Sequence, residues 1–154
     1  IRKYQFKNKE AEECYNTYLI KAMKGSEPSD SLKVLNDILI LEPDIEDPSF
    51  LYFYANALRE NGEAEKAGKV YYKSYTCEPR YRLFKDNIII GHEVNKQLGM
   101  YSFRKKEYSR AEWHLWVALS YWYDPNRESH RATKELHRRC GEYKQGKGLA
   151  EWDR

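Results

Sequence analysis

The amino-acid sequence predicts an all-α fold, and three observations support this prediction. Apolar residues recur at helical spacing along most of the 154 residues. The breaks between these segments are short and rich in glycine, proline and aspartate, as in "GSEPSD" and "EPDIEDP". Asp47-Pro48 and Asp124-Pro125 each combine an N-cap acceptor with a proline suited to the first helical position. The pattern predicts helices over about 8–24, 29–41, 48–61, 63–76, 81–105, 107–121 and 126–140.

Local signals separate these helices in order along the chain. "GSEPSD" divides the first helix from the second, and "EPDIEDP" divides the second from the third. Asn61-Gly62 supplies a left-handed ending for the third helix, and "CEPR" ends the fourth. "IIIG" at 88–91 would suit a strand, but the helical pattern on both sides favours a helix. "YDPN" divides the last two helices.

Length and composition predict a single domain over residues 1–154. A chain of this length with 41% apolar residues can bury one core. Its 27 basic and 24 acidic side chains give a net charge of +3, too small to favour nucleic acid over the whole chain. Residues 1–60 hold 8 basic and 11 acidic side chains, so the remainder is the basic part. The 14 tyrosines indicate a recognition surface as well as a core.

The cysteines and the lack of targeting signals indicate where in the cell the protein is expected. Cys14, Cys77 and Cys140 are far apart and form no C-x-x-C motif, which predicts neither a disulfide framework nor a zinc knuckle. We therefore expect a reducing, cytoplasmic location. No apolar run approaches the length of a membrane span and no signal-peptide pattern is present, so no membrane partner is expected. Because the chain begins at Ile1 and not at Met, we expect a processed product or, preferably, a fragment of a longer protein.

Residues 50–79, "FLYFYANALRENGEAEKAGKVYYKSYTCEP", have small, aromatic and proline residues at intervals that a lone helix would not require. This stretch resembles the tetratricopeptide repeat, a helix–turn–helix unit of about 34 residues. The resemblance implies close helix crossing at small residues, a turn at a glycine, an aromatic on the second helix and a terminating proline. The matching residues are Ala55, Leu58, Gly62, Ala67, Tyr71, Ser74 and Pro79.

Two further stretches are similar to the same repeat. Residues 96–125 place matching residues at Leu98-Gly99, Tyr108, Ala111, Leu115 and Ala118-Leu119. A degenerate copy over about 12–43 matches at Ser31, Leu35, Ile38 and Pro43, but has Leu19 where a small residue is expected. Ten extra residues, "YRLFKDNIII", offset the later copies and must lengthen a helix or form a loop.

The resemblance implies a right-handed α-α superhelix of about three repeats. Their expected bounds are 12–45, 48–80 and 92–125. A capping helix at about 126–140 follows, charged on most faces as the end of a solenoid requires, and then a tail over 141–154.

Members of this family line a concave groove with the first helix of each repeat and bind a peptide or a partner helix there. The resemblance therefore implies a non-catalytic protein-interaction or scaffold module. Asparagine can pair with a peptide backbone, basic side chains can bind carboxylates, and aromatic or methionine side chains offer apolar contact. The predicted partner-binding residues are Asn16, Tyr52, Asn56, Arg59, Lys96, Met100, Phe103 and Arg104.

The carboxylate clamp of some co-chaperones, which grips acidic chaperone tails, is not predicted. That clamp needs lysine, asparagine and arginine at five groove positions. Only Arg104 satisfies the pattern at the matching positions, which are Asn16, Ile20, Phe53, Met100 and Arg104.

We expect no catalysis, cofactor or metal. The sequence has no phosphate loop, nucleophile elbow or carboxylate pair with an obvious partner. His130, His137 and Cys140 could share one helical face, but a fourth zinc ligand is not evident, so packing or solvation is preferred. The tryptophans at 113, 116 and 122 could form one stripe, which predicts core or inter-helix packing.

Two other functions remain open. Basic residues alternate with aromatic ones near 80–85 and 101–106, which would suit stacking with single-stranded RNA. Glu93, Glu107 and Glu112 interrupt that basic stripe, so nucleic acid is the less favoured partner. The chain could also be the docking or dimerisation module of a larger enzyme, with self-association as its role. The RNA-facing residues would be Arg80, Tyr81, Arg82, Phe84, Lys85, Tyr101, Phe103, Arg104, Lys105 and Lys106.

Overall fold

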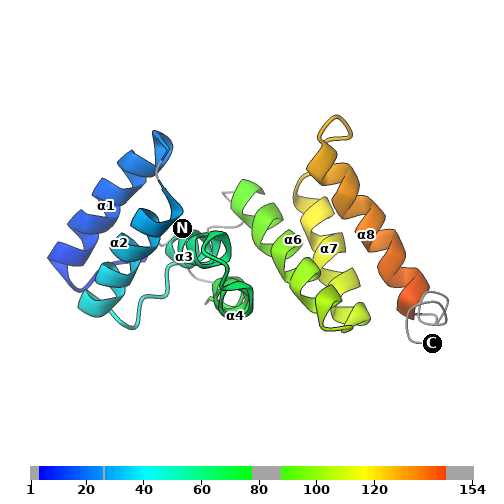
Figure 1. Ribbon diagram of the computed structural model, residues 1–154, viewed down its shortest axis with the longest axis horizontal. Helices are drawn as coiled ribbons and strands as arrows, with labels where there is room; N and C mark the ends of the chain where they lie inside the picture. Colours follow the sequence, from blue (N-terminus) through cyan, green and yellow to red (C-terminus); the bar gives the residue numbers. More distant parts are fainter. Residues whose placement is uncertain (1–3, 26, 78–87, 145–154) are drawn as a thin grey trace. The chain divides into compact units, whose positions relative to one another are not determined.

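The computed structural model describes residues 4–25, 27–77 and 88–144, and this part of the chain contains seven α-helices and no strand (Figure 1). The all-α prediction is therefore confirmed. The chain divides into two compact units, Ile1–Arg82 (unit 1) and Leu83–Arg154 (unit 2). The helices are α1 (Lys9–Met23), α2 (Pro28–Leu41), α3 (Pro48–Glu60), α4 (Ala64–Tyr75), α6 (Ile88–Arg104), α7 (Tyr108–Tyr121) and α8 (Glu128–Lys144).

The predicted starts and ends of α1, α2, α3, α4 and α7 are each confirmed to within one residue. The segment 88–91 lies in helix α6, as the flanking pattern predicts. The start predicted for this helix, at 81, lies outside the described residues. N-caps account for two of the helix starts, because Asn8 accepts from the Ala11 N–H at 3.0 Å and Asp47 accepts from the Ser49 N–H at 3.3 Å.

Two predictions for the last helix are wrong. Asp124 does not cap it: the Asp124 carboxylate accepts from the Asn126 N–H at 2.9 Å in a turn, and α8 begins at Glu128. The helix also continues past the predicted end at 140, into the segment expected to be tail. Its last turn is stabilised by Lys144, whose Nζ lies 2.8 Å from Glu112 Oε1, and by the ring of Tyr143 against Tyr108.

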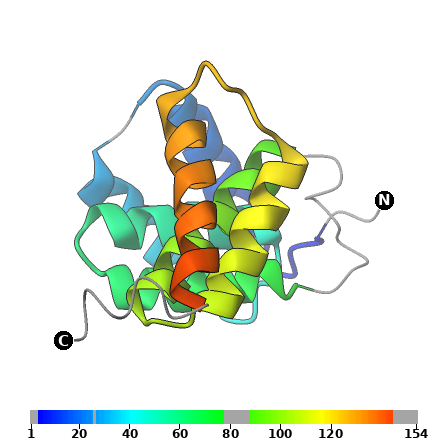
Figure 2. The same cartoon turned by 90° about the vertical axis from the view of Figure 1, so that its right-hand side faces the viewer.

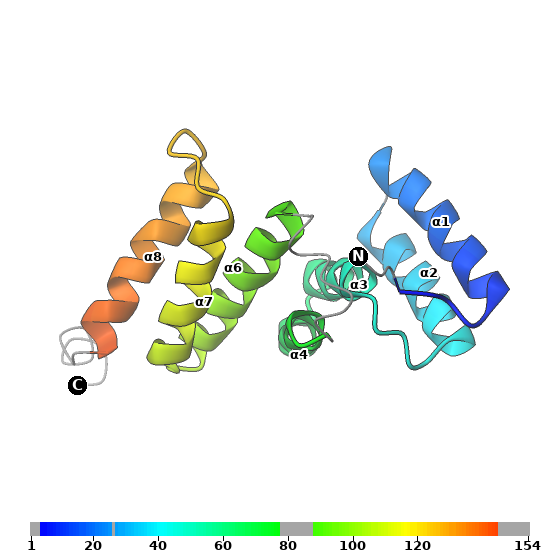
Figure 3. The same ribbon diagram turned by 180° about the vertical axis from the view of Figure 1, so that it is seen from behind.

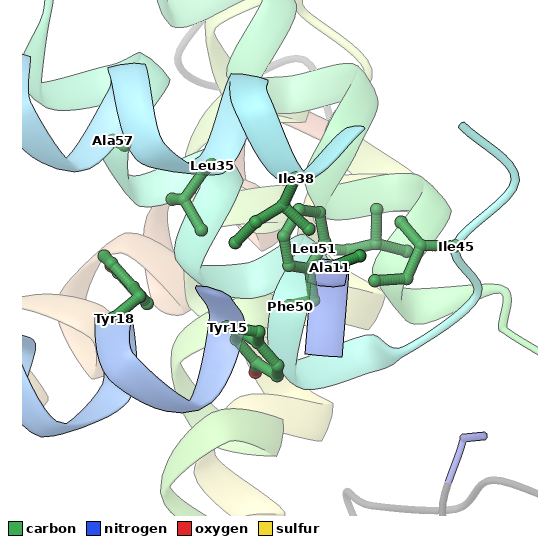
Figure 4. Packing of buried hydrophobic residues seen from close by; sticks show 9 residues of the cluster. All are labelled: Ala11, Tyr15, Tyr18, Leu35, Ile38, Ile45, Phe50, Leu51 and Ala57. Atoms are coloured by element: carbon green, nitrogen blue, oxygen red, sulfur yellow. The ribbon is translucent and has the colours of Figure 1, made fainter. Parts of the chain in front are cut away.

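The core of unit 1 lies among α1, α2 and α3. Figure 4 shows Tyr15 and Tyr18 of α1 packed with Leu35 and Ile38 of α2 and Phe50 of α3. The Tyr15 ring meets Phe50 edge-on at a centroid distance of 5.5 Å. Burying these large side chains away from water supplies the main stabilisation of the unit.

A buried carboxylate fixes the segment that leads into α1. The Glu42 Oε1 atom accepts from the backbone N–H groups of Lys7 and Asn8 at 2.7 and 2.8 Å, and the Tyr4 hydroxyl donates to Oε2. Several hydrogen bonds to one carboxylate offset the cost of burying its charge. The chain before α1 is therefore attached to the end of α2.

The α3–α4 hairpin confirms most of the tetratricopeptide-like positions. Ala55, Leu58 and Ala67 are buried, as the repeat pattern predicts, and Gly62 adopts φ 83° in the turn between the two helices. The Ser74 hydroxyl donates to the Pro48 carbonyl at 2.8 Å, which ties the end of α4 to the start of α3. Pro79, the predicted terminator, lies outside the described residues.

Unit 2 contains α6, α7 and α8 side by side, as Figures 1 and 3 show from opposite directions. Figure 2 places α8 nearest the viewer, next to α7. Gly99 lets α6 approach α7, because a Cβ atom there would lie 2.5 Å from the Leu115 side chain. Cys140 of α8 packs on Ala111 and Leu115 of α7.

Candidate functional site

Two of the predicted partner-binding residues meet at one buried hydroxyl in unit 1. The Tyr71 hydroxyl of α4 donates to Asn56 Oδ1, and Arg59 Nε donates to the same hydroxyl oxygen at 3.1 Å. Asn56 and Arg59 are three residues apart on α3, so they lie on the same side of the helix. Tyr71 is buried, which fixes both polar side chains against a rigid ring.

The surroundings keep the Arg59 guanidinium charged. Burial alone would lower the pKa of Arg59, but the hydrogen bond to Tyr71 and the proximity of Glu60 and Tyr52 raise it. Tyr52 is itself half-buried, and its ring lies 5.3 Å from that of Phe53. This side of α3 thus presents an arginine, an amide and an aromatic ring together.

Asn16 lies on the exposed surface of α1. The link between α1 and α3 is aromatic: Tyr18 meets Phe53 edge-on at 6.0 Å. Asn16 shares no described contact with Asn56 or Arg59.

The other four predicted residues lie on α6 in unit 2, in different surroundings. Lys96 Nζ pairs with Glu93 Oε2 at 2.9 Å, with both side chains largely covered. Met100 is partly exposed and Arg104 is exposed. Phe103 packs edge-on against Tyr108 and Tyr143, at 5.5 and 5.3 Å, so part of its ring serves the contact of α6 with α7 and α8.

The tryptophan prediction is wrong for two of its three residues. Trp113 and Trp116 on α7 are 52% and 53% exposed, and their rings lie 5.6 Å apart on the surface. The core face of α7 is formed instead by smaller residues, such as Ala111, Leu115 and Ala118, which let α6 and α8 approach. Trp122 alone of the three is half-buried and packs against His130.

Three of the four histidines of unit 2 are buried in its core. The His92 Nδ1–H donates to the Ala118 carbonyl at 2.8 Å, and His130 Nδ1 accepts from the Asp124 N–H at 2.9 Å. Their rings lie 4.3 Å apart, with Trp122 against His130 at 4.6 Å. The third, His114, shares its Nδ1–H with Asn95 Oδ1 at 3.1 Å.

His130 and Cys140 do not share one site. His130 faces His92, whereas Cys140 packs among apolar residues of α7 and has a pKa raised to about 11, mainly by burial. His137 is partly exposed and lies beside a hollow between α7 and α8. Within the described residues, no cluster of three or more histidine, cysteine or acidic side chains could hold a metal ion.

The possible RNA-binding residues are described only in part. Arg80, Tyr81, Arg82, Phe84 and Lys85 lie outside the described residues. Near the α6–α7 turn, the Lys105 ammonium lies 4.6 Å from the ring centroid of Tyr101. That ring is therefore engaged by a lysine of its own chain.

Sequence reasoning missed two features of unit 1. It treated Tyr71 as a packing aromatic, although a tyrosine carries a hydroxyl that needs a partner when buried. It also missed a hollow between α1 and α2 with an acidic lining. The signal for this hollow was the run "EAEE" at 10–13 followed by Asp30 in the next helix.

Comparison with known proteins supports the fold. No protein-family model matches the chain, and no curated protein sequence matches it significantly. Among solved structures, the chain is similar to the Sgt2 TPR domain from Aspergillus fumigatus, with 17% identity and a TM-score of 0.57 over 89% of this chain and 83% of that one. It is also similar to the Yersinia enterocolitica type III secretion chaperone SycD, solved with a peptide of the translocator YopD, with 17% identity and a TM-score of 0.49 over 91% and 93% of the two chains.

The described helices are short or carry many charged residues. None of them is both long and apolar enough to cross a membrane. Paired helices with small residues at their crossings, together with the likeness to the Sgt2 domain, show that this chain folds as a tetratricopeptide-like helical repeat.

Proposed function

We propose that the chain is a non-catalytic protein-interaction module that binds an extended peptide or a partner helix through the first helices of its repeats. The observation that carries this proposal is the arrangement of Asn56 and Arg59 on the buried Tyr71 hydroxyl. Polar side chains held in place before binding lose less conformational entropy when a partner arrives.

The chemistry of this arrangement suits a peptide. Since Asn56 Oδ1 accepts from Tyr71, its Nδ2 group supplies donors for a peptide carbonyl. The Arg59 guanidinium uses Nε for Tyr71, and its terminal nitrogens have the geometry for a carboxylate. Tyr52 adds apolar contact on the same helix. The other proposed binding residues are Asn16 on α1 and, on α6 of unit 2, Lys96, Met100, Phe103 and Arg104.

The test uses the full chain and an Asn56→Ala, Lys96→Ala, Arg104→Ala variant as baits in a pull-down from source-cell lysate, with and without nuclease. We expect a protein partner that survives nuclease treatment and is lost with the variant. A Lys69→Ala, Lys73→Ala, Arg110→Ala variant is the matched control, because it removes three exposed side chains from α4 and α7. Circular dichroism must show that both variants are folded.

Other outcomes would contradict the proposal. Equal recovery of partners by the wild type and by the Asn56→Ala, Lys96→Ala, Arg104→Ala variant would show that these three side chains do not bind the partners. Partners lost on nuclease treatment, together with recovered RNA, would support the nucleic acid alternative. Recovery of the bait alone would indicate self-association.

A further inference from the structure

A second surface of unit 1, separate from Asn56 and Arg59, has the form of a binding site. A hollow of about 580 Å³ lies between α1 and α2. Its apolar lining includes Cys14 and Tyr18 of α1 and Val34 of α2. Hollows of several hundred Å³ are large enough to enclose one or two side chains of a ligand.

The floor of this hollow is rigid. Tyr18 is only 8% exposed, and its ring stacks on Tyr15 at 6.4 Å and meets Phe53 edge-on at 6.0 Å. Figure 4 shows Tyr18 extending from α1 beside the buried side chains of α2. Val34 is on the surface at 36% exposure, so apolar area remains in contact with solvent there. An apolar side chain entering the hollow would cover this area.

The charge around the hollow is one-sided. Three carboxylates line it, those of Glu10, Glu13 and Asp30, against one lysine, Lys21. Glu10 and Asp30 lie in the first turns of α1 and α2, where the helix dipole stabilises acidic side chains. The dipole does not account for Glu13, which lies beyond the first turn, or for the convergence of acids from two helices on one hollow.

We propose that this hollow binds a basic peptide segment of a partner protein, with an aliphatic side chain seated over Tyr18 and Val34 and flanking lysine or arginine residues paired with the three carboxylates. Nucleic acid does not suit this surface, because its phosphates would be repelled by the same carboxylates. This proposal is independent of the peptide-binding groove proposed above, since Asn56 and Arg59 of that groove do not line the hollow.

The test measures fluorescence anisotropy of the full chain with a fluorescein-labelled peptide in which lysines flank a pair of leucines. Two further probes replace the lysines by glutamates or the leucines by glycines. We expect saturable, salt-sensitive binding of the lysine–leucine probe and at least a tenfold loss with either altered probe. Absence of saturable binding, or equal binding of the glutamate probe, would overturn the proposal.

Protein variants locate the binding. Glu13→Gln with Asp30→Asn should weaken binding about tenfold, because it removes two of the carboxylates. Glu12→Gln with Asp44→Asn makes the same change in net charge at exposed positions outside the hollow. This control variant should bind the lysine–leucine probe with nearly the affinity of the wild type. Equal losses in both variants would mean that only net charge matters and would overturn the proposal.

The groove variant separates the two proposed sites. Asn56→Ala, Lys96→Ala, Arg104→Ala should leave affinity for the lysine–leucine probe unchanged. If that variant loses the probe while Glu13→Gln with Asp30→Asn keeps it, the probe occupies the groove and the hollow is not its site. Failure of the groove pull-down would leave this measurement unaffected.

Discussion

At the scale of single residues, Tyr71 has two roles in unit 1. Its ring is buried, as the repeat pattern predicts for an aromatic on α4, and its hydroxyl joins Asn56 and Arg59 of α3. The sequence identifies the first role, because an aromatic is expected at that position. The second depends on α3 bringing an amide and a guanidinium to the same atom, which only the packed hairpin does.

We predict that Tyr71→Phe lowers the free energy of unfolding by about 1–2 kcal/mol. The ring packing is retained, but Asn56 loses its donor and Arg59 its acceptor. Urea unfolding followed by far-UV circular dichroism measures the change. Tyr72→Phe is the matched control, because Tyr72 is half exposed on the same helix. Equal stability of the two variants would show that the hydroxyl contributes nothing.

At the scale of helices, the close approach of α6 and α7 depends on the absence of a side chain at Gly99. The nearest atoms to an added Cβ would be Leu115 Cγ and Cδ2, both at 2.5 Å, on a buried side chain. A buried leucine cannot move far in a close-packed interior. The repeat resemblance marks this position as small, and the structure identifies the leucine that requires it.

We predict that Gly99→Ala destabilises unit 2 by about 1–3 kcal/mol, despite the better helix propensity of alanine. The urea midpoint of tryptophan fluorescence measures this, since all four tryptophans lie in Leu83–Arg154. Gly141→Ala on α8 is the control, because its added Cβ would come no closer than 3.4 Å to the Glu112 carboxylate. The close-approach argument fails if both substitutions have the same effect.

At the scale of the whole molecule, unit 1 contains a buried carboxyl group with a raised pKa, and unit 2 contains buried imidazoles with lowered pKa values. In unit 1, burial raises the pKa of Asp47 to about 6, against hydrogen bonds from Ser49 and Phe50 that lower it. In unit 2, burial lowers the pKa of His114 to about 4, with Arg110 adding to the effect. Burial also lowers the pKa of His130.

These shifts predict opposite pH dependences. Folded Asp47 binds its proton more tightly than the unfolded chain does, so its contribution to stability is present at low pH and lost as the pH rises through about 6. Folded His114 binds a proton more weakly, so its contribution is present above pH 6.5 and lost as the pH falls towards 4. Between pH 6.5 and 4.5, Asp47 should raise the stability of unit 1 and His114 should lower that of unit 2, by on the order of 2 kcal/mol each.

Urea unfolding at pH 6.5 and pH 4.5 checks this. The fluorescence midpoint, which reports unit 2, should fall at the lower pH, while the circular dichroism transition should separate into two steps. Asp47→Asn keeps an N-cap acceptor without the charge, and should abolish the gain in unit 1 while leaving the fluorescence change intact. A single transition that shifts identically by both methods would contradict the prediction.

The sequence by itself determined the helices and the repeat, because these depend on local signals. Helical periodicity, N-cap residues and small residues such as Ala55, Ala67 and Gly99 act over a few residues or one hairpin. The helix positions that these signals specify do not depend on contacts from distant parts of the chain. The length of α8 was missed because Lys144 and Tyr143 stabilise its last turn through α6 and α7, far away in sequence.

Tertiary structure decided which side chains serve the core and which serve the surface. Spacing predicted burial for Trp113 and Trp116, but close packing at Leu115 and Ala118 left those indoles exposed and placed histidines inside. The Tyr71 hydrogen bonds and the acidic hollow likewise need two helices at a fixed separation. A periodic pattern specifies that a helix has an apolar face, whereas the choice of contacts depends on how closely its neighbours approach.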